Sequence, residues 1–116
     1  QDLATRKSAF SRDGTDIYCA ALEKPRALSA ALNYYRNLLR PQQWLRLWER
    51  SPLPIQIPTL VLWGEDDQFL SKRLTQGLEH LVAAPLRLKL IPHCGHWTQQ
   101  EAPDTVNREL LKFLRQ

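Results

Sequence analysis

Residues 58–97 begin with the run Pro58-Thr59-Leu60-Val61-Leu62-Trp63-Gly64-Glu65-Asp66-Asp67 and end with Pro92-His93-Cys94-Gly95-His96-Trp97. Residues 59–63 are a short apolar run between a proline and a glycine, which is typical of a buried strand. Residues 86–91 alternate apolar and polar side chains and predict a second strand with one solvated face. The leucine spacing of residues 71–83 predicts a helix between them. Because one crossover joins the two strands, we expect them to be parallel, with their C-terminal ends at one edge.

An acid and an imidazole follow these two strands. Glu65, Asp66 and Asp67 come directly after the first strand, and His96 lies in the turn after the second. A carboxylate that holds one ring nitrogen of a histidine fixes its tautomer and allows the other nitrogen to accept a proton, as a general base requires. The alternative is an aspartate that caps the following helix and a histidine whose ring is satisfied by backbone groups. The shared edge favours the catalytic interpretation.

The composition sets limits on the class of protein. The chain has 116 residues, is 43% hydrophobic and carries a net charge of +4, which indicates one globular, domain-sized unit. Its basic residues are scattered among acids, so we do not expect nucleic-acid binding. No apolar run reaches the roughly 18 residues of a membrane span. Cys19 and Cys94 are too few for a disulfide framework, and reduced thiols suggest a cytoplasmic protein.

Three further helices are expected. Thr15 or Asp16 is the predicted N-cap of a short helix over residues 17–23, and a longer helix is expected over residues 27–39. Pro103 suits the first turn of a last helix that ends near Leu114. A short amphipathic turn is expected after Pro41. It contains Trp44 and Trp48, which we expect to pack against the rest of the protein rather than bind a membrane.

The segment 58–67, together with Cys94-Gly95-His96-Trp97-Thr98-Gln99-Gln100-Glu101-Ala102-Pro103 and then Val106-Asn107, closely resembles the C-terminal end of α/β-hydrolases of the epoxide hydrolase and haloalkane dehalogenase group. In that pattern the acid is the last residue of Gly-Glu-x-Asp, which maps to Asp67 rather than Asp66. The base is the histidine of Gly-His, which maps to His96. The resemblance therefore implies an α/β fold: two parallel strands with flanking helices, from the C-terminal portion of an α/β-hydrolase.

The resemblance extends to the first 52 residues, which are similar to the rear half of the lid over the active site in epoxide hydrolases. The run Leu32-Asn33-Tyr34-Tyr35-Arg36-Asn37 carries this similarity. It implies that the phenol of Tyr35 faces the substrate, where it can hydrogen-bond and then protonate an epoxide oxygen. The alternative is that Tyr34 and Tyr35 are half-buried packing residues on an amphipathic helix. We therefore expect a lid segment over residues 1–52 and a core segment over 53–116.

The nucleophile is not expected in this chain. Covalent hydrolysis in this fold uses a Gly-x-Ser-x-Gly elbow or its aspartate counterpart, and the sequence contains neither. In the family order the nucleophile precedes the acid and the histidine, so we expect an N-terminal portion, as a separate chain or a missing segment, to complete the enzyme. We expect the chain to be inactive alone and its first strand to expose unpaired backbone along one side.

The resemblance implies a hydrolase for small hydrophobic epoxides that needs no cofactor. The alternatives within the fold are a haloalkane or fluoroacetate-type dehalogenase, a serine-type esterase and a carbon–carbon bond hydrolase. The alternative of another class is a binding domain without activity. His93, Cys94 and His96 could ligate a metal, but structural zinc sites draw on ligand pairs far apart, and the other cysteine, Cys19, stands alone. We expect Cys94 to pack behind the histidine, which could modestly activate its thiol.

Overall fold

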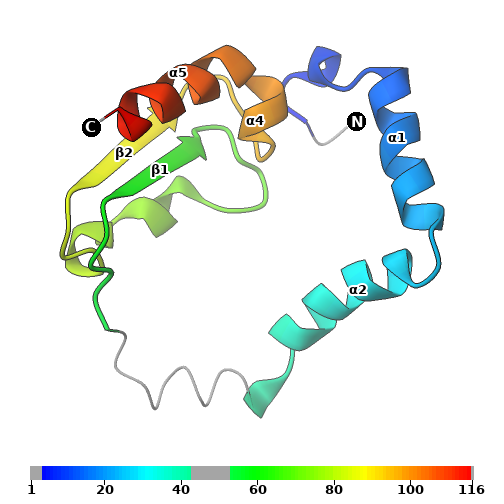
Figure 1. The fold of residues 1–116 in the computed structure, drawn as a ribbon, viewed down its shortest axis with the longest axis horizontal. Coiled ribbons are helices and arrows are strands. Elements are labelled where there is room, and N and C mark those ends of the chain that lie inside the picture. The colour runs from blue at the N-terminus through cyan, green and yellow to red at the C-terminus, as the bar shows by residue number, and fades with distance from the viewer. Residues whose placement is uncertain (1–3, 43–52, 116) are drawn as a thin grey trace. The chain divides into compact units, whose positions relative to one another are not determined.

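The computed structural model describes residues 4–42 and 53–115. It consists of two compact units, whose helices and strands are labelled in Figure 1. The sheet unit contains the described residues of 1–10 and 54–116, and the helical unit contains those of 11–53. The division differs from the predicted one at the N-terminus, because residues 1–10 belong to the unit that holds the sheet. In the described ranges, no helix has the length and hydropathy needed to span a bilayer.

The sheet unit is built on two parallel strands, as predicted. Strand β1 covers Thr59–Gly64 and strand β2 covers Leu86–Ile91. Their register pairs Thr59 with Leu86 at one end and Gly64 with Ile91 at the other. Both strands therefore end at the same level, and the segments that follow them start side by side at one edge of the sheet.

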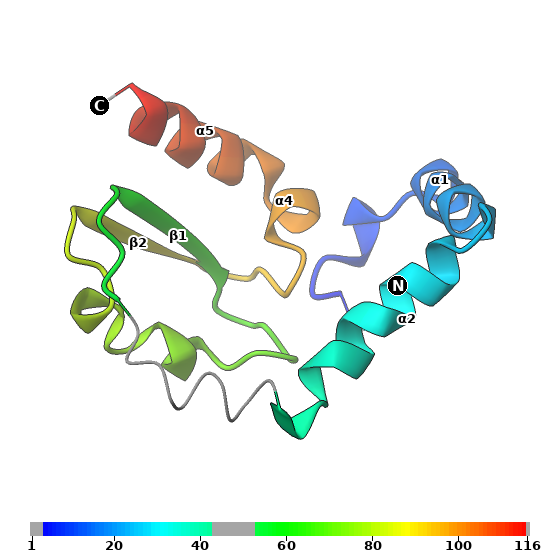
Figure 2. The same ribbon diagram turned by 60° about the horizontal axis from the view of Figure 1, so that its bottom comes forward.

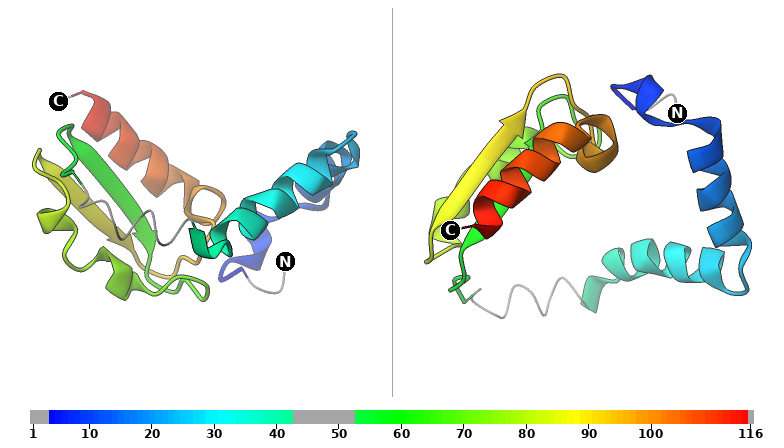
Figure 3. Two further views of the ribbon diagram at one scale, coloured as in Figure 1. Left: turned by 90° about the horizontal axis from the view of Figure 1, so that it is seen from below. Right: turned by 45° about the horizontal axis from the view of Figure 1, so that its top comes forward.

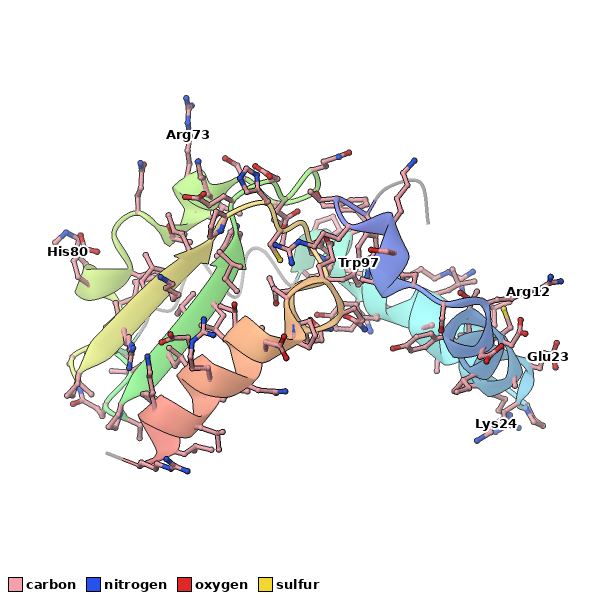
Figure 4. All side chains as sticks on the ribbon, turned by 90° about the horizontal axis from the view of Figure 1, so that it is seen from above. Arg12, Glu23, Lys24, Arg73, His80 and Trp97 are labelled. Carbon is pink, nitrogen blue, oxygen red and sulfur yellow. The ribbon has the colours of Figure 1, made fainter. Side chains whose placement is uncertain are left out.

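The connection between the strands is not the predicted helix over residues 71–83. Two short 3₁₀ helices take its place, η2 over Lys72–Thr75 and η3 over Leu78–His80. Gly77, between them, has a φ of 82°, a left-handed conformation that interrupts an α-helix. The side chains of Arg73 and His80, one in each 3₁₀ helix, extend away from the sheet (Figure 4).

Two helices follow β2. Helix α4 covers Thr98–Glu101, and α5 covers Pro103–Leu114 with its proline in the first turn, as predicted. Helix α5 lies along one side of the two strands, and η2 and η3 lie along the other (Figures 2 and 3). The buried apolar cluster of this unit is small: it consists of Ile91, Cys94, Ala102 and Val106, with Leu62 packed against it.

The helical unit contains two amphipathic helices that contact each other, α1 over Arg12–Glu23 and α2 over Ala27–Leu38. The predicted start of α1 was wrong: the helix begins at Arg12, five residues before the predicted start at Ile17. Ser11 is the N-cap, and its hydroxyl accepts a hydrogen bond from the N–H of Gly14 at 3.1 Å. The predictions for Trp44 and Trp48 lie outside the described residues.

Candidate active site

The ends of the two strands are joined by backbone hydrogen bonds. The N–H of Glu65 donates to the carbonyl of Ile91 at 3.0 Å, and the N–H of Asp66 donates to that of Cys94 at 3.0 Å. Gly64 allows this close approach, because a Cβ there would overlap the backbone carbonyls of Cys94 and Gly95. Residues 65–70, called here the acid loop, and residues 92–97, called the histidine loop, are therefore fixed against each other.

Asp67 and His96 meet where these loops touch. Oδ2 of Asp67 lies 2.9 Å from Nδ1 of His96. The other carboxylate oxygen, Oδ1, accepts hydrogen bonds from the N–H groups of Phe69 at 2.8 Å and Leu70 at 2.9 Å. The Asp67 side chain is only 6% exposed. Both oxygens are thus hydrogen-bonded, which fixes the orientation of the carboxylate toward the imidazole.

The hydrogen bonds hold Asp67 in its ionised form. Burial is the largest single effect on its pKa and acts to raise it, since a carboxylate loses hydration in the protein. The hydrogen bond with His96 and those from Leu70 and Phe69 act in the opposite direction and together outweigh burial. The pKa of Asp67 consequently lies below its ordinary value, and the carboxylate is available to orient a histidine at neutral pH.

The imidazole of His96 is placed by aromatic side chains and borders a pocket. Its ring centroid lies 5.2 Å from that of Phe69 and 5.6 Å from that of Trp97, which precedes α4 (Figure 4). Its side chain is 38% exposed. The adjoining open pocket has a volume of about 160 Å³. It is lined by Leu62, Trp63, Gly64, Asp67, Leu70, His96 and Thr98.

This arrangement can move a proton at the pocket. Because the carboxylate engages Nδ1, the neutral ring carries its proton there, and Nε2 is the nitrogen that can accept one. The ionised Asp67 stabilises the imidazolium that results. The pair therefore has the geometry of a general base, oriented by an acid, beside a cavity for a small molecule.

The other acid named by the sequence takes a different position. The Asp66 carboxylate lies 3.9 Å from Nδ1 of His93, whose side chain is 90% exposed. That contact is at the surface, so Asp66 does not orient His96.

Tyr35 lies in the helical unit. It is in α2, its side chain is exposed, and its ring contacts that of Tyr34 edge to face at a centroid distance of 5.8 Å. The structure therefore brings Asp67 and His96 together within one unit, and the approach of Tyr35 to them stays a prediction.

Cys94 is fully buried in the sheet unit, as expected for a residue that packs behind the histidine. Its expected activation was wrong. Burial raises the pKa of the Cys94 thiol, and the charge of Glu101 raises it further. Within residues 4–42 and 53–115, no three His, Cys, Asp or Glu side chains are grouped so as to hold a metal ion.

Two residues near the histidine loop were missed by the sequence analysis. Arg6 and Glu101 both hydrogen-bond to backbone groups of this loop. Glu101 could have been suspected, because a lone glutamate five residues after His96 precedes an Ala-Pro helix start. Arg6 gave no signal, since its contacts lie 87 and 95 positions away in the chain.

Comparison with known proteins agrees with this geometry. The family described as "Alpha/beta hydrolase family" matches residues 3–109, so the chain belongs to this family. Epoxide hydrolase 3 of Xenopus tropicalis is 38% identical over 107 residues, which are 92% of this chain and 28% of that protein. A 2-hydroxy-6-oxononadienedioate/2-hydroxy-6-oxononatrienedioate hydrolase of Comamonas testosteroni is 41% identical over 86 residues, 70% of this chain and 29% of that protein.

A solved structure resembles the chain along almost its whole length. The crystal structure of Bacillus megaterium epoxide hydrolase in complex with an inhibitor has a TM-score of 0.76 and 25% identity. The matched region covers 96% of this chain and 40% of the Bacillus megaterium chain. The predicted resemblance to α/β-hydrolases of the epoxide hydrolase group is thus confirmed. The chain spans less than half the length of each of these three relatives.

Proposed function

We propose that the chain supplies the acid–base pair of an epoxide hydrolase, with Asp67 as the orienting acid and His96 as the general base. The observation that carries the proposal is the 2.9 Å contact between Oδ2 of Asp67 and Nδ1 of His96 beside the pocket. The proteins it resembles include epoxide hydrolases of Xenopus tropicalis and Bacillus megaterium. A small hydrophobic epoxide suits a pocket whose walls include Leu62, Trp63 and Leu70.

The proposed reaction has two steps. In the first, an aspartate outside this chain attacks an epoxide carbon, the ring C–O bond breaks, and the released oxygen takes a proton from the phenol of Tyr35. This step leaves an ester between the aspartate and the opened substrate. In the second, Nε2 of His96 removes a proton from water, whose oxygen attacks the carbonyl carbon of the ester. The ester's C–O bond breaks, the leaving oxygen takes the second proton of the water from the new carboxyl group, and the diol leaves with the aspartate restored. The proton gained by His96 then returns through water to the phenolate of Tyr35, so that both side chains are restored.

The proposal includes a partner and a compartment. The nucleophile, the second oxygen-holding group and the strands beside β1 belong to an N-terminal portion, present as a separate chain or as the same polypeptide. Without it, His96 has no ester on which to act, so the chain alone is expected to be inactive. The cytoplasm is the compartment in which the free thiols of Cys19 and Cys94 persist. The proposed reaction uses no cofactor or metal.

A serine nucleophile is the second candidate. The Comamonas testosteroni relative is named as a hydrolase of a dienedioate and trienedioate rather than an epoxide. An oriented histidine can serve a serine as readily as a water molecule, so the pair of Asp67 and His96 is compatible with both reactions. The nucleophile outside this chain decides between them.

Single-turnover labelling tests the proposal. The whole enzyme, in excess over an epoxide, is allowed to react once in H₂¹⁸O, and its peptides and the diol are then examined by mass spectrometry. Water is expected to attack the ester carbonyl, so ¹⁸O appears in an aspartate of the enzyme and not in the diol. A diol labelled in the first turnover would show direct attack of water on the epoxide and would contradict the proposal. An acyl-serine formed on an ester substrate, without epoxide turnover, would establish the second candidate.

A further inference from the structure

The Glu101 carboxylate lies behind the histidine loop and is 3% exposed. Its Oε2 accepts two backbone hydrogen bonds, from the N–H of Gly95 at 3.0 Å and from the N–H of Arg6 at 2.9 Å. Gly95 directly precedes His96. A buried carboxylate with two N–H donors is held firmly, because either donor left unpaired would cost free energy. Glu101 thus fixes the backbone from which His96 extends.

The space around Gly95 shows how closely the carboxylate fits the histidine loop. A Cβ at Gly95 would lie 2.8 Å from Oε1 of Glu101 and 2.8 Å from the hydroxyl oxygen of Thr5. Real side chains do not approach so closely without displacing their neighbours. The backbone at this point is therefore confined between α4, which carries Glu101, and the N-terminal segment.

The Arg6 side chain holds the same loop from its other end. Its Nε donates to the carbonyl of His93 at 2.9 Å, and its Nη1 donates to the backbone carbonyl of Glu101 at 3.1 Å. His93 has a φ of 53°, a left-handed conformation that costs a residue with a side chain free energy. The guanidinium thus links α4 to His93, the residue of the histidine loop whose backbone is strained.

The N-terminal segment also packs on the residue after His96. Ala4 is buried, and the Phe10 ring contacts that of Trp97 edge to face at a centroid distance of 5.5 Å. Trp97 in turn contacts His96. Residues 4–10 therefore touch the histidine loop on both sides of His96, although they lie far from it in the sequence.

We infer that Glu101 and Arg6 are positioning residues for His96: through Gly95 and His93 they keep the histidine loop where Nδ1 meets the carboxylate of Asp67. The inference rests on the proposed role of His96 as the base. Neither residue touches the substrate or the reacting atoms. Their effect arises because a displacement of about 1 Å in a catalytic group can reduce a rate by about 10²-fold.

The test compares two buried glutamates of the sheet unit. Glu101→Ala removes the acceptor behind Gly95. Glu109→Ala removes a carboxylate of α5 with similar burial, 5% exposed. This carboxylate pairs with Arg87 of β2 at 2.6 Å. Each variant is made in the whole enzyme and studied where chemical unfolding shows it to be fully folded. Two quantities are measured: the rate of the ester-hydrolysis step within a single turnover, and the ¹⁵N shifts of His96, which report its tautomer.

We expect Glu101→Ala to slow ester hydrolysis by about 10²-fold and to reduce the population of His96 with its proton on Nδ1. Glu109→Ala is expected to change neither quantity, although it also lowers stability. Glu101→Gln should restore most of both, because an amide oxygen still accepts from the N–H of Gly95. If Glu101→Ala, like Glu109→Ala, changes neither the His96 tautomer nor the rate of ester hydrolysis, the inference is wrong.

Arg6 provides a second test, which decides the question if Glu101→Ala does not fold. Arg6→Ala keeps the backbone N–H that donates to the Glu101 carboxylate but removes the two hydrogen bonds that the guanidinium donates. We therefore expect a smaller change in the same two quantities than Glu101→Ala causes. Arg6→Lys should not restore them, because an ammonium is a point donor and cannot reproduce the fork that reaches two carbonyls. An unchanged His96 spectrum in Arg6→Ala would overturn its role.

The two readouts separate this inference from the proposed function. The ¹⁵N shifts of His96 need no substrate. If the whole enzyme does not open epoxides but Glu101→Ala still changes the His96 tautomer, the proposed reaction fails and the positioning role stands. If the whole enzyme hydrolyses epoxides and Glu101→Ala leaves the His96 tautomer unchanged, the proposed reaction stands and the positioning role fails.

Discussion

The sheet unit and the helical unit differ in what holds their functional side chains. In the sheet unit, Asp67 is 6% exposed and both its oxygens are hydrogen-bonded within the same unit. In the helical unit, α1 and α2 contain no buried residue, and Tyr35 is 66% exposed. The acid–base pair is therefore positioned by this chain's own contacts, whereas the phenol is presented on a helix surface.

The difference shows that a carboxylate and an imidazole can be preorganised by a small part of a fold. Asp67 and His96 meet through contacts of the two loops that follow β1 and β2. The amphipathic helices carry apolar side chains such as Ile17 and Leu28, at 70% and 55% exposure, on a surface that needs a partner to be covered. Substitutions in the two units should therefore differ in kind as well as in size.

The largest effect is expected from Asp67→Asn in the sheet unit. An amide can hydrogen-bond Nδ1 but cannot hold the productive tautomer or stabilise an imidazolium, and the loss in a comparable triad is about 10⁴-fold. We expect a drop of that order in the rate of ester hydrolysis by the whole enzyme. Tyr35→Phe is the matched change in the helical unit and should slow ring opening while ester hydrolysis keeps its rate. Pre-steady-state kinetics separates the two steps, and equal effects on both would remove the distinction between the units.

Gly64→Ala is expected to have the next largest effect. Its new methyl group would overlap the backbone carbonyls of Cys94 and Gly95, so the free energy of unfolding should fall by about 1–3 kcal/mol. Gly14→Ala in α1 is the control, because its Cβ would meet only the end of a side chain, the Ser11 hydroxyl at 3.1 Å, and no backbone atom. Its effect should stay below about 1 kcal/mol. Urea unfolding measures both, and a tolerated alanine at Gly64 would show that the loops are not tightly joined.

Acid is expected to weaken the sheet unit through Asp67. Its pKa is lower in the folded chain than in the unfolded one, so the unfolded state binds its proton first as the pH falls. The stabilisation is therefore complete above the ordinary carboxyl pKa of about 3.9 and is lost as the pH drops through the folded value. Thermal unfolding from pH 7 to pH 2 should show a smaller loss on the acid side in Asp67→Asn. An identical pH dependence would contradict the shift.

The smallest effects are expected at two residues with left-handed backbones, one in each unit. His93 has a φ of 53° and Arg26 has a φ of 66°. Glycine adopts this conformation without strain, so Arg26→Gly should stabilise the helical unit by about 0.5–1 kcal/mol. His93→Gly should gain less, because it also removes the imidazole that lies 3.9 Å from the Asp66 carboxylate. Hydrogen exchange, read unit by unit, measures both, and a larger gain at His93 would argue against a stabilising contact with Asp66.

Local patterns predicted most of the sheet unit. The apolar run before Gly64, the alternation of residues 86–91 and the position of Pro103 fixed both strands and α5, because each element leaves its period in neighbouring residues. The helix over residues 71–83 was predicted from Ser71 as its cap and from the spacing of its apolar residues. That prediction failed because the left-handed Gly77 interrupts the segment, and a glycine's φ is set by tertiary contacts rather than by spacing.

The site was predictable only as far as it follows from topology. Parallel strands bring Asp67 and His96 to one edge, so that contact could be expected from the order of elements. The roles of Arg6 and Glu101 could not, because their hydrogen bond joins residues 95 positions apart and leaves no periodic pattern. The start of α1 was misjudged for a local reason: the N-cap was predicted at Thr15 or Asp16, whereas Ser11 caps the helix through the N–H of Gly14.

The tautomer of His96 in the unaltered protein tests the account most directly. If Asp67 accepts a hydrogen bond from Nδ1, ¹⁵N spectra of the neutral ring should show the proton on Nδ1 and a bare Nε2. Asp67→Ala should shift the ring toward the Nε2–H form that free histidine prefers. A wild-type ring with its proton on Nε2 would leave bare only Nδ1, which faces the carboxylate of Asp67 and not the pocket, and would contradict the assignment of His96 as the base.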